Sequence, residues 1–227
     1  MNLFPITCVD DFYKDPYKIR ELASSLDYEN KIGNYPGVRS PLLHKVLPDF
    51  FNVFCQKFFS LFYNYECEEV NWVIESYFQK VYSYDDEELN VGHIHRDEGG
   101  CIFAGLIYLN PNPVLDSGTS LYSLKESETF DYDEEYSSRE KLKRKFYRNE
   151  LDDTTFYKQS LKKHNSKFKK TLEIKNIYNR LVSYPYDVWH SQSDFKMNDE
   201  PRLTQVFFVE KLQCPTTPLS RSKNYDL

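Results

Sequence analysis

The sequence predicts a single, mainly β domain with flanking helices. Short segments rich in β-branched and aromatic residues follow one another at 71–109 and again at 177–209. Aromatic residues make up 17% of the chain and there are only 7 glycines. These rings can bury enough area to offset the ordering entropy, so a disordered, collagen-like or linker-like chain is excluded. At 227 residues the chain is long enough for one real core, and we treat 1–227 as one domain.

Residues 1–65 are predicted to form a helical N-terminal layer. Asp15 can cap a helix that has Pro16 at its first position, and residues 19, 22 and 23 continue with apolar side chains at helical spacing. Residues 47–63 repeat apolar side chains at similar intervals, which predicts a second, largely buried helix.

The strand candidates lie in two blocks. Alternating or continuous apolar segments predict strands at 71–84, 91–97, 101–109, 177–184 and 203–209. The sequence Asn110–Pro111–Asn112–Pro113 is typical of a turn and ends the third of them. We therefore place the β core at 66–123 and 176–212 and a C-terminal tail at 213–227.

Residues 124–175 differ from the rest of the chain in charge. They contain 14 Lys and Arg and 11 Asp and Glu, with acidic residues first and basic residues after them. Helices are expected at about 138–149 and 153–164. The segment is interpreted either as a solvated helical insertion, or as a lid or substrate-docking element whose basic half attracts an acidic partner.

Composition also bears on partners and compartment. The net charge of −6 argues against nucleic acid or an anionic membrane as a partner. The five cysteines are widely spaced without a CxxC pair, which disfavours a disulfide framework and a thiolate zinc site. The start of the chain lacks a basic and an apolar signal region, and no apolar run reaches about 20 residues. We expect a cytoplasmic protein; the oligomeric state stays open.

Two of the five histidines alternate with an aspartate. His93, His95 and Asp97 occupy every second position of HIHRD, so on a strand all three side chains face the same way. Far downstream, His190 directly follows another strand candidate. Two imidazoles and one carboxylate form the facial set of ligands that suits non-haem Fe(II) and leaves coordination positions open. The sequence therefore suggests an iron site.

An enzyme that uses a cosubstrate with a carboxylate also needs a cation to bind it, and the next strand candidate contains one. Arg202 and Thr204 are two residues apart, so they share a face of that strand. A guanidinium fork matches carboxylate geometry better than an ammonium does. The ordered series of HxD, distal histidine and Arg-x-Thr is more specific than any of its parts.

With these motifs the sequence resembles the Fe(II)/2-oxoglutarate-dependent oxygenases, in particular their prolyl-hydroxylase-like branch. The resemblance implies a double-stranded β-helix (a jelly-roll or cupin-like barrel), with His95, Asp97 and His190 as iron ligands. It also implies that Arg202, assisted by Thr204, holds the distal carboxylate of 2-oxoglutarate. Residues 107–122 (IYLNPNPVLDSGTSLY) resemble a strand and turn of the family, and by that match Tyr108 would form a hydrogen bond with 2-oxoglutarate. Tyr84 is similar to a second family tyrosine.

The resemblance covers about residues 9–123 and 176–210. His93 remains an alternative ligand on the same face. Asp97 favours hydroxylation over halogenation, because halogenases of this superfamily lack the carboxylate. The residues after Arg202 lack the second arginine of the nucleic-acid demethylase branch. His44 and His164 match no motif and are expected to be structural or solvent-exposed.

The activity implied is hydroxylation of a C–H bond in an amino acid, prolyl residue or small metabolite, using O₂ and releasing succinate and CO₂. Partners would be a small-molecule or peptidyl substrate, with no membrane. Two alternatives stay open: a cupin-like metalloenzyme that does not use 2-oxoglutarate, and a non-enzymatic binding protein on a degenerate jelly-roll.

Overall fold

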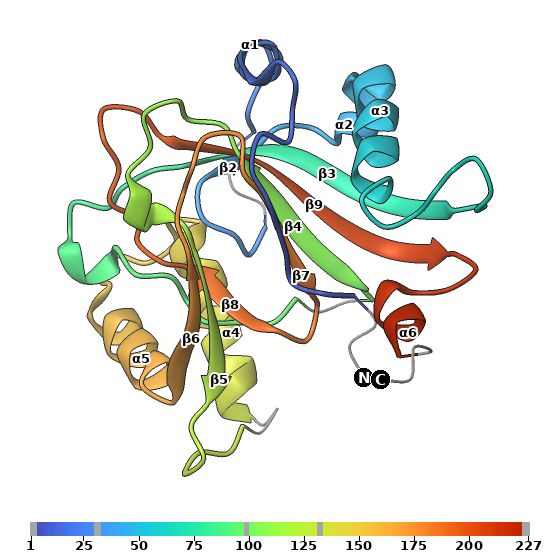
Figure 1. Ribbon diagram of the computed structural model, residues 1–227. Coiled ribbons are helices and arrows are strands. Elements are labelled where there is room, and N and C mark those ends of the chain that lie inside the picture. Colours follow the sequence, from blue (N-terminus) through green and yellow to red (C-terminus); the bar gives the residue numbers. More distant parts are fainter. Residues whose placement is uncertain (1–3, 30–32, 98–99, 131–133, 224–227) are drawn as a thin grey trace.

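Two antiparallel sheets form the centre of the protein, seen here in a computed structural model (Figure 1). The structure describes residues 4–29, 33–97, 100–130 and 134–223. The chain is mostly β with a few helices, as the sequence predicted. Within the described residues, no helix is both long and apolar enough to cross a membrane.

The larger sheet has six strands in the order β1-β7-β4-β9-β3-β2. They are β1 (Thr7–Val9), β7 (Leu181–Pro185), β4 (Phe103–Tyr108), β9 (Arg202–Gln213), β3 (Asn71–Val81) and β2 (Val38–Arg39). Every pair in this order is antiparallel. The N-terminal layer therefore adds an edge strand at each side of the sheet, in addition to its helices.

The smaller sheet has the order β6-β5-β8. Its strands are β6 (Phe168–Ile174), β5 (Thr119–Leu124) and β8 (Trp189–Gln192). The chain passes from β7 in the large sheet to β8 in the small one within a few residues, so His190 lies on a different sheet from Arg202.

Alternation along the central strands directs side chains to two cores. On β4 and β9, Phe103, Ile107, Leu203 and Phe207 face the N-terminal helices. Their neighbours Ala104, Leu106, Tyr108 and Val206 join the layer that includes Leu121 and Ile174 of the small sheet. Every residue of β4 is buried because both faces of the strand are covered.

The N-terminal helices cover the outer face of the large sheet (Figure 1). They are α1 (Pro16–Ser24), α2 (Leu43–Val46) and α3 (Pro48–Phe59). Asp15 caps α1 as predicted, because its carboxylate accepts from the Lys18 amide at 3.1 Å. In α3, Phe54 and Phe58 pack on Phe207 with ring centroids 5.3 and 4.8 Å away. Aromatic packing therefore anchors this layer.

The charged segment contains two helices and one strand. Helices α4 (Glu134–Tyr147) and α5 (Thr155–Asn165) agree with the two predicted helices. The predicted boundary at residue 175 needs correction, because β6 pairs with β5 and belongs to the small sheet. Periodicity within a highly charged stretch did not indicate this strand, of which only the two end residues are buried.

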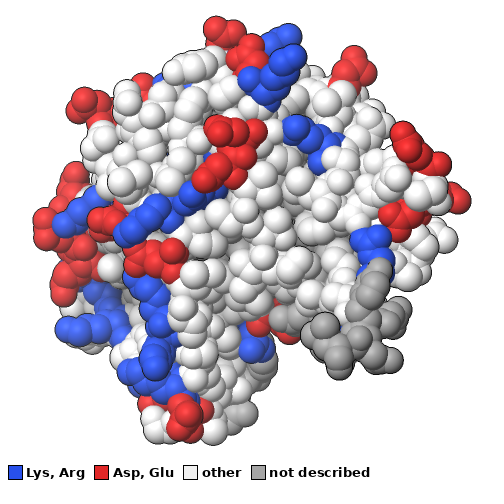
Figure 2. Space-filling view, viewed as in Figure 1, with Lys and Arg blue, Asp and Glu red and all other residues white. Residues whose placement is uncertain are grey.

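Acidic and basic side chains are interspersed on much of the surface, and basic ones gather over the region of α5 and β6 (Figure 2). Many of them already have acidic partners in the same chain. Lys158 lies 2.7 Å from Asp86, and Lys170 and Lys175 lie 2.6 Å from Glu173 and Asp116 respectively. Exposed pairs of this kind contribute little to stability, but they leave less free charge for an acidic partner.

Residues 91–97 are extended but do not form the predicted strand. Their single ladder contact is an isolated bridge between His95 and His190. A side chain at Gly92 would meet the Gln192 carbonyl oxygen 2.2 Å away, so the segment approaches β8 at a distance that only glycine allows. Because pairing is confined to one residue, strict alternation of side chains is not imposed here.

The remaining elements are short. They are the 3₁₀ turns η1 (Glu87–Leu89) and η2 (Leu115–Ser117), and α6 (Pro218–Ser222) within the predicted C-terminal tail.

Candidate metal centre

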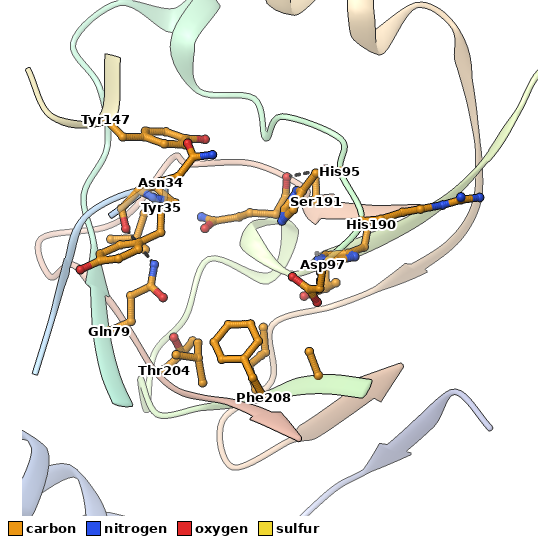
Figure 3. A pocket seen from close by; sticks show the side chains of 18 of the residues that line it. Asn34, Tyr35, Gln79, His95, Asp97, Tyr147, His190, Ser191, Thr204 and Phe208 are labelled. Carbon is orange, nitrogen blue, oxygen red and sulfur yellow. Dashed lines mark hydrogen bonds and ion pairs between the residues drawn. The ribbon is translucent and has the colours of Figure 1, made fainter. Parts of the chain in front are cut away.

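His95, Asp97 and His190 lie together on one side of a cavity between the two sheets (Figure 3). One ligand atom from each lies within 4.8 Å of the other two. Among the described residues this is the one group of three or more His, Cys, Asp and Glu side chains with such an arrangement. The bridge between His95 and His190 brings the HxD segment and β8 together.

Each histidine of the group is oriented by a backbone carbonyl two residues before it. His95 Nδ1 donates to the His93 carbonyl at 2.8 Å, and His190 Nδ1 donates to the Val188 carbonyl at 2.9 Å. A carbonyl only accepts, so each ring carries a proton on Nδ1, and this tautomer leaves the lone pair of Nε2 for a ligand. This is the orientation in which an imidazole can bind a metal through Nε2.

The carboxylate completes a donor set that fits a divalent cation. Asp97 Oδ2 is buried without a hydrogen-bond partner and lies 3.7 Å from His190 Nε2. A buried carboxylate oxygen without a donor is costly, and a metal ion would offset that cost. Burial lowers the pKa of His95 well below its usual range, so this ring is neutral near pH 7, as a ligand must be. Two imidazoles and one carboxylate suit Fe(II).

A buried arginine faces the same cavity. Arg202 at the start of β9 is 5% exposed, and its guanidinium donates to Gln192 Oε1 on β8. Its Nε is buried without a partner, and none of the described residues forms an ion pair with it. Burial lowers its pKa, an effect that Tyr108 opposes. A desolvated cation without a counterion provides a site for an anionic ligand.

Of the other predicted residues, Thr204 lines the cavity, whereas Tyr108 and Tyr84 do not. Thr204 shares the cavity face of β9 with Arg202. Tyr108 does not line the cavity: it is fully buried behind it, with its ring centroid 5.2 Å from the Arg202 guanidinium and its hydroxyl 2.8 Å from Thr119 Oγ1. Tyr84 was expected near the cosubstrate, but it packs against Phe146 and Phe195 with centroids 5.2 and 5.6 Å away.

His93 does not share the face of His95 and Asp97, so the expectation from strand alternation is wrong for this residue. Its ring stacks on His164 of α5 with centroids 4.4 Å apart, away from the cavity. His164 is buried as well and donates from Nε2 to the Ile94 carbonyl at 2.6 Å. His164 is therefore structural, while His44 is exposed.

Several cavity residues carry no motif that could have identified them. Tyr184 lies with its ring centroid 4.4 Å from that of His190, and Gln192 holds Arg202. Both alternate with their neighbours on β7 and β8, so a correct assignment of strand faces would have found them. The side of the cavity formed by Arg39 and helix α4 could not be predicted from local sequence, because it depends on how distant segments pack.

The fold is shared with a protein solved with a metal and 2-oxoglutarate. HygX from Streptomyces hygroscopicus with nickel and 2-oxoglutarate bound has a TM-score of 0.53 and 10% identity, over 91% of this chain and 83% of that chain. With hygromycin B also bound, HygX gives a TM-score of 0.54 and 11% identity over the same shares. A prolyl hydroxylase from Trichoplax adhaerens in complex with a hypoxia inducible factor peptide fragment gives 0.48 and 10%, over 97% and 87%. At these identities the likeness to HygX concerns the fold alone.

The family is shown by sequence. Residues 2–208 match the model of DUF6445, described as a family of unknown function, and the chain belongs to that family. No curated protein matches the chain.

Proposed function

We propose that this protein is an Fe(II)- and 2-oxoglutarate-dependent oxygenase that hydroxylates a C–H bond of a small substrate. The observation that carries the proposal is that the His95–Asp97–His190 group and the uncompensated Arg202 line one cavity. We further propose that the two sheets constitute a double-stranded β-helix related to the prolyl-hydroxylase-like branch. The HygX fold and its bound ligands support the proposal by analogy.

His95, Asp97 and His190 would hold Fe(II), and Arg202 with Thr204 would hold the distal carboxylate of 2-oxoglutarate. With O₂, the bound iron and cosubstrate would supply oxidation of a C–H bond coupled to release of succinate and CO₂. The Nδ1 hydrogen bonds to the carbonyls of residues 93 and 188 keep both rings aimed at the metal without rearrangement.

The chain's contribution beyond ligation is to position the cosubstrate and exclude water. Gln192 fixes the guanidinium of Arg202, and the ring of Tyr108 lies behind it. We assign Tyr108 a positioning role through Arg202, in place of a direct bond to the cosubstrate. The apolar side chains of Leu106, Val206 and Phe208 line the cavity beside these polar groups and limit hydration.

Anaerobic titration tests the proposal. Fe(II) and 2-oxoglutarate added together should produce a weak visible charge-transfer band, and admission of O₂ should release succinate even without substrate. Arg202→Ala should weaken 2-oxoglutarate binding by at least about tenfold, because it removes a charge-assisted fork, while Fe(II) still binds. Arg20→Ala, which removes a partly exposed arginine paired with Glu200, is the matched control.

The outcomes separate the alternatives. Metal binding that is insensitive to 2-oxoglutarate and to Arg202→Ala would indicate a metalloenzyme that does not use this cosubstrate. Absence of both metal binding and succinate would contradict the oxygenase proposal and favour a binding protein.

A further inference from the structure

The side of the cavity opposite the candidate metal ligands comes from distant parts of the chain. Tyr35 and Gln79 lie across the open space from Asp97 and His190 (Figure 3). Helix α4 adds Tyr136, Glu140, Lys143 and Tyr147 to the cavity. Their spacing of four, three and four residues puts them on one face of the helix. The first helix of the charged segment thus forms part of the cavity wall.

Arg39 is held firmly in this wall. Its Nε donates to Gln79 Oε1 at 3.1 Å, and Gln79 Nε2 in turn donates to the Pro36 carbonyl at 2.7 Å, which fixes the orientation of the amide. The guanidinium carbon lies 3.9 Å from the centroid of the Tyr35 ring and 5.3 Å from those of Tyr77 and Phe208. These contacts fix the plane of the guanidinium and leave its two terminal nitrogens without a hydrogen-bond partner in the described part of the chain.

The acidic side chains described around Arg39 do not form an ion pair with it. Lys143 and Glu140 lie 3.3 Å apart, and Asn34 donates to the same Glu140 oxygen at 2.8 Å, so that this carboxylate is already engaged. Within the described residues no carboxylate forms an ion pair with Arg39. Burial lowers the pKa of Arg39, while Tyr35, Tyr77 and the nearby carboxylates of Asp97 and Glu75 oppose this effect. A half-buried, oriented and unpaired guanidinium is suited to an anion.

The proposed cosubstrate does not account for this second arginine. Arg202 is held by Gln192 beside Tyr108, whereas Arg39 is held by Gln79 beside Tyr35. The two guanidinium groups therefore have separate supports on separate strands, β9 and β2. One carboxylate of 2-oxoglutarate would occupy Arg202, and the other end would be at the metal. Arg39 remains for the substrate.

We propose that Arg39 binds an anionic oxygen group of the substrate, which is therefore a small organic acid carrying a carboxylate or a phosphate. The inference rests on the proposed function, because the bound anion is a substrate only if the protein is an oxygenase. The cavity of about 360 Å³ is at the small end of ligand sites, which favours a small molecule over a peptidyl substrate. The rings of Tyr35, Tyr136 and Tyr147 suit an apolar or aromatic body between this anchor and the metal site.

Matched probes test the proposal without iron. Phenylacetate and phenylacetamide have nearly the same shape and differ in charge, and phenyl phosphate provides the phosphate arm. Each is titrated into the metal-free, full-length protein and followed by ligand-observed NMR. The acid should bind about 10- to 100-fold more tightly than the amide, as expected for hydrogen bonds to a charged group. Whichever of phenylacetate and phenyl phosphate binds more tightly identifies the anionic group of the substrate.

Variants locate the anion. Because Arg202 can also bind the acid when 2-oxoglutarate is absent, the comparison is made in the Arg202→Gln protein. There Arg39→Gln should bring the affinities for acid and amide to within about twofold, and Arg39→Lys should give an intermediate ratio because it keeps the charge and loses the fork. Arg202→Gln should keep the preference for the acid. Unfolding midpoints in urea, measured for each variant, show whether it folds; a purely structural role of Arg39 would lower affinity for acid and amide alike.

Two results would overturn the inference. One is equal binding of acid and amide by the wild-type protein, which requires no variant to fold. The other is a preference for the acid that survives when Arg39→Gln is combined with Arg202→Gln. Failure of the proposed function would give a different result from failure of this inference. The charge-transfer band and succinate release would be absent, while the Arg39-dependent preference for the acid in metal-free protein would persist.

Discussion

His95 and His190 form a reciprocal pair of backbone hydrogen bonds, each 2.9 Å long, in which the amide of each donates to the carbonyl of the other. In an antiparallel bridge of this type the two side chains lie on the same side. Their ring centroids are 4.4 Å apart. The backbone therefore sets the separation of the two imidazoles before any metal binds.

Asp97→Ala should abolish stabilisation by metal while the metal-free protein stays folded. Asp97 Oδ2 has no hydrogen-bond partner, so its loss should cost no more than about 1 kcal/mol in metal-free protein. Wild-type protein with Ni²⁺ at 100 times its Kd should gain about 2.7 kcal/mol, and the variant should gain none. Chemical unfolding with and without Ni²⁺ measures both quantities. Asp199→Ala, which removes an exposed carboxylate, is the control; an unfolded metal-free Asp97→Ala would mean that the carboxylate is structural.

Gly92→Ala should separate the HxD segment from β8. The added Cβ would clash with the backbone carbonyl oxygen of Gln192. This oxygen cannot move without disrupting the small sheet, so we expect a loss of about 1–3 kcal/mol in the free energy of unfolding. Metal affinity should fall as well, because the bridge holds His95 against His190. Isothermal titration with Ni²⁺ measures the affinity. Val91→Ala, at an exposed position one residue earlier, should change neither; wild-type affinity in Gly92→Ala would show that the bridge is dispensable.

Tyr84→Phe should leave the affinity for 2-oxoglutarate within about twofold of wild type, since Tyr84 packs against Phe146 of α4 and does not line the cavity. Arg202→Ala serves as the positive control in the same binding titration. A large loss of affinity in Tyr84→Phe would restore the role that the family resemblance implied.

Stability of the metal-free protein should fall as the pH is lowered below neutrality. Burial lowers the pKa of His164 from 6.5 to about 4. The unfolded chain therefore binds a proton that the folded chain does not bind between these values, so stability is retained above pH 6.5 and is lost as the pH falls toward 4. The shift corresponds to about 3 kcal/mol at most. His93 and His95 act in the same direction.

Urea unfolding at pH 7.5 and 5.0 in EDTA measures this dependence. His164→Phe should reduce the pH dependence without removing it, because the ring still packs against Phe168 while one titrating group is lost. An unchanged dependence would show that His164 is protonated in the folded protein or does not titrate in this range.

Much of the candidate site could be predicted because its signals are local. The two-residue period of an extended chain puts Arg202 and Thr204 on one face wherever β9 lies, and the structure has both in the cavity. The same rule failed for His93, because residues 91–97 are paired at one residue only. Alternation is reliable where a ladder imposes it on successive residues.

The sequence by itself determined the mainly β class, the capped helix at Pro16 and the spacing of His95, Asp97, His190 and Arg202, since each depends on backbone geometry over a few residues. Only the tertiary structure decided that β6 joins the small sheet, that Tyr84 packs against Phe146 of α4, and that Arg39 lines the same cavity as the candidate metal ligands. These outcomes depend on packing and desolvation between segments far apart in the chain, which no local pattern records.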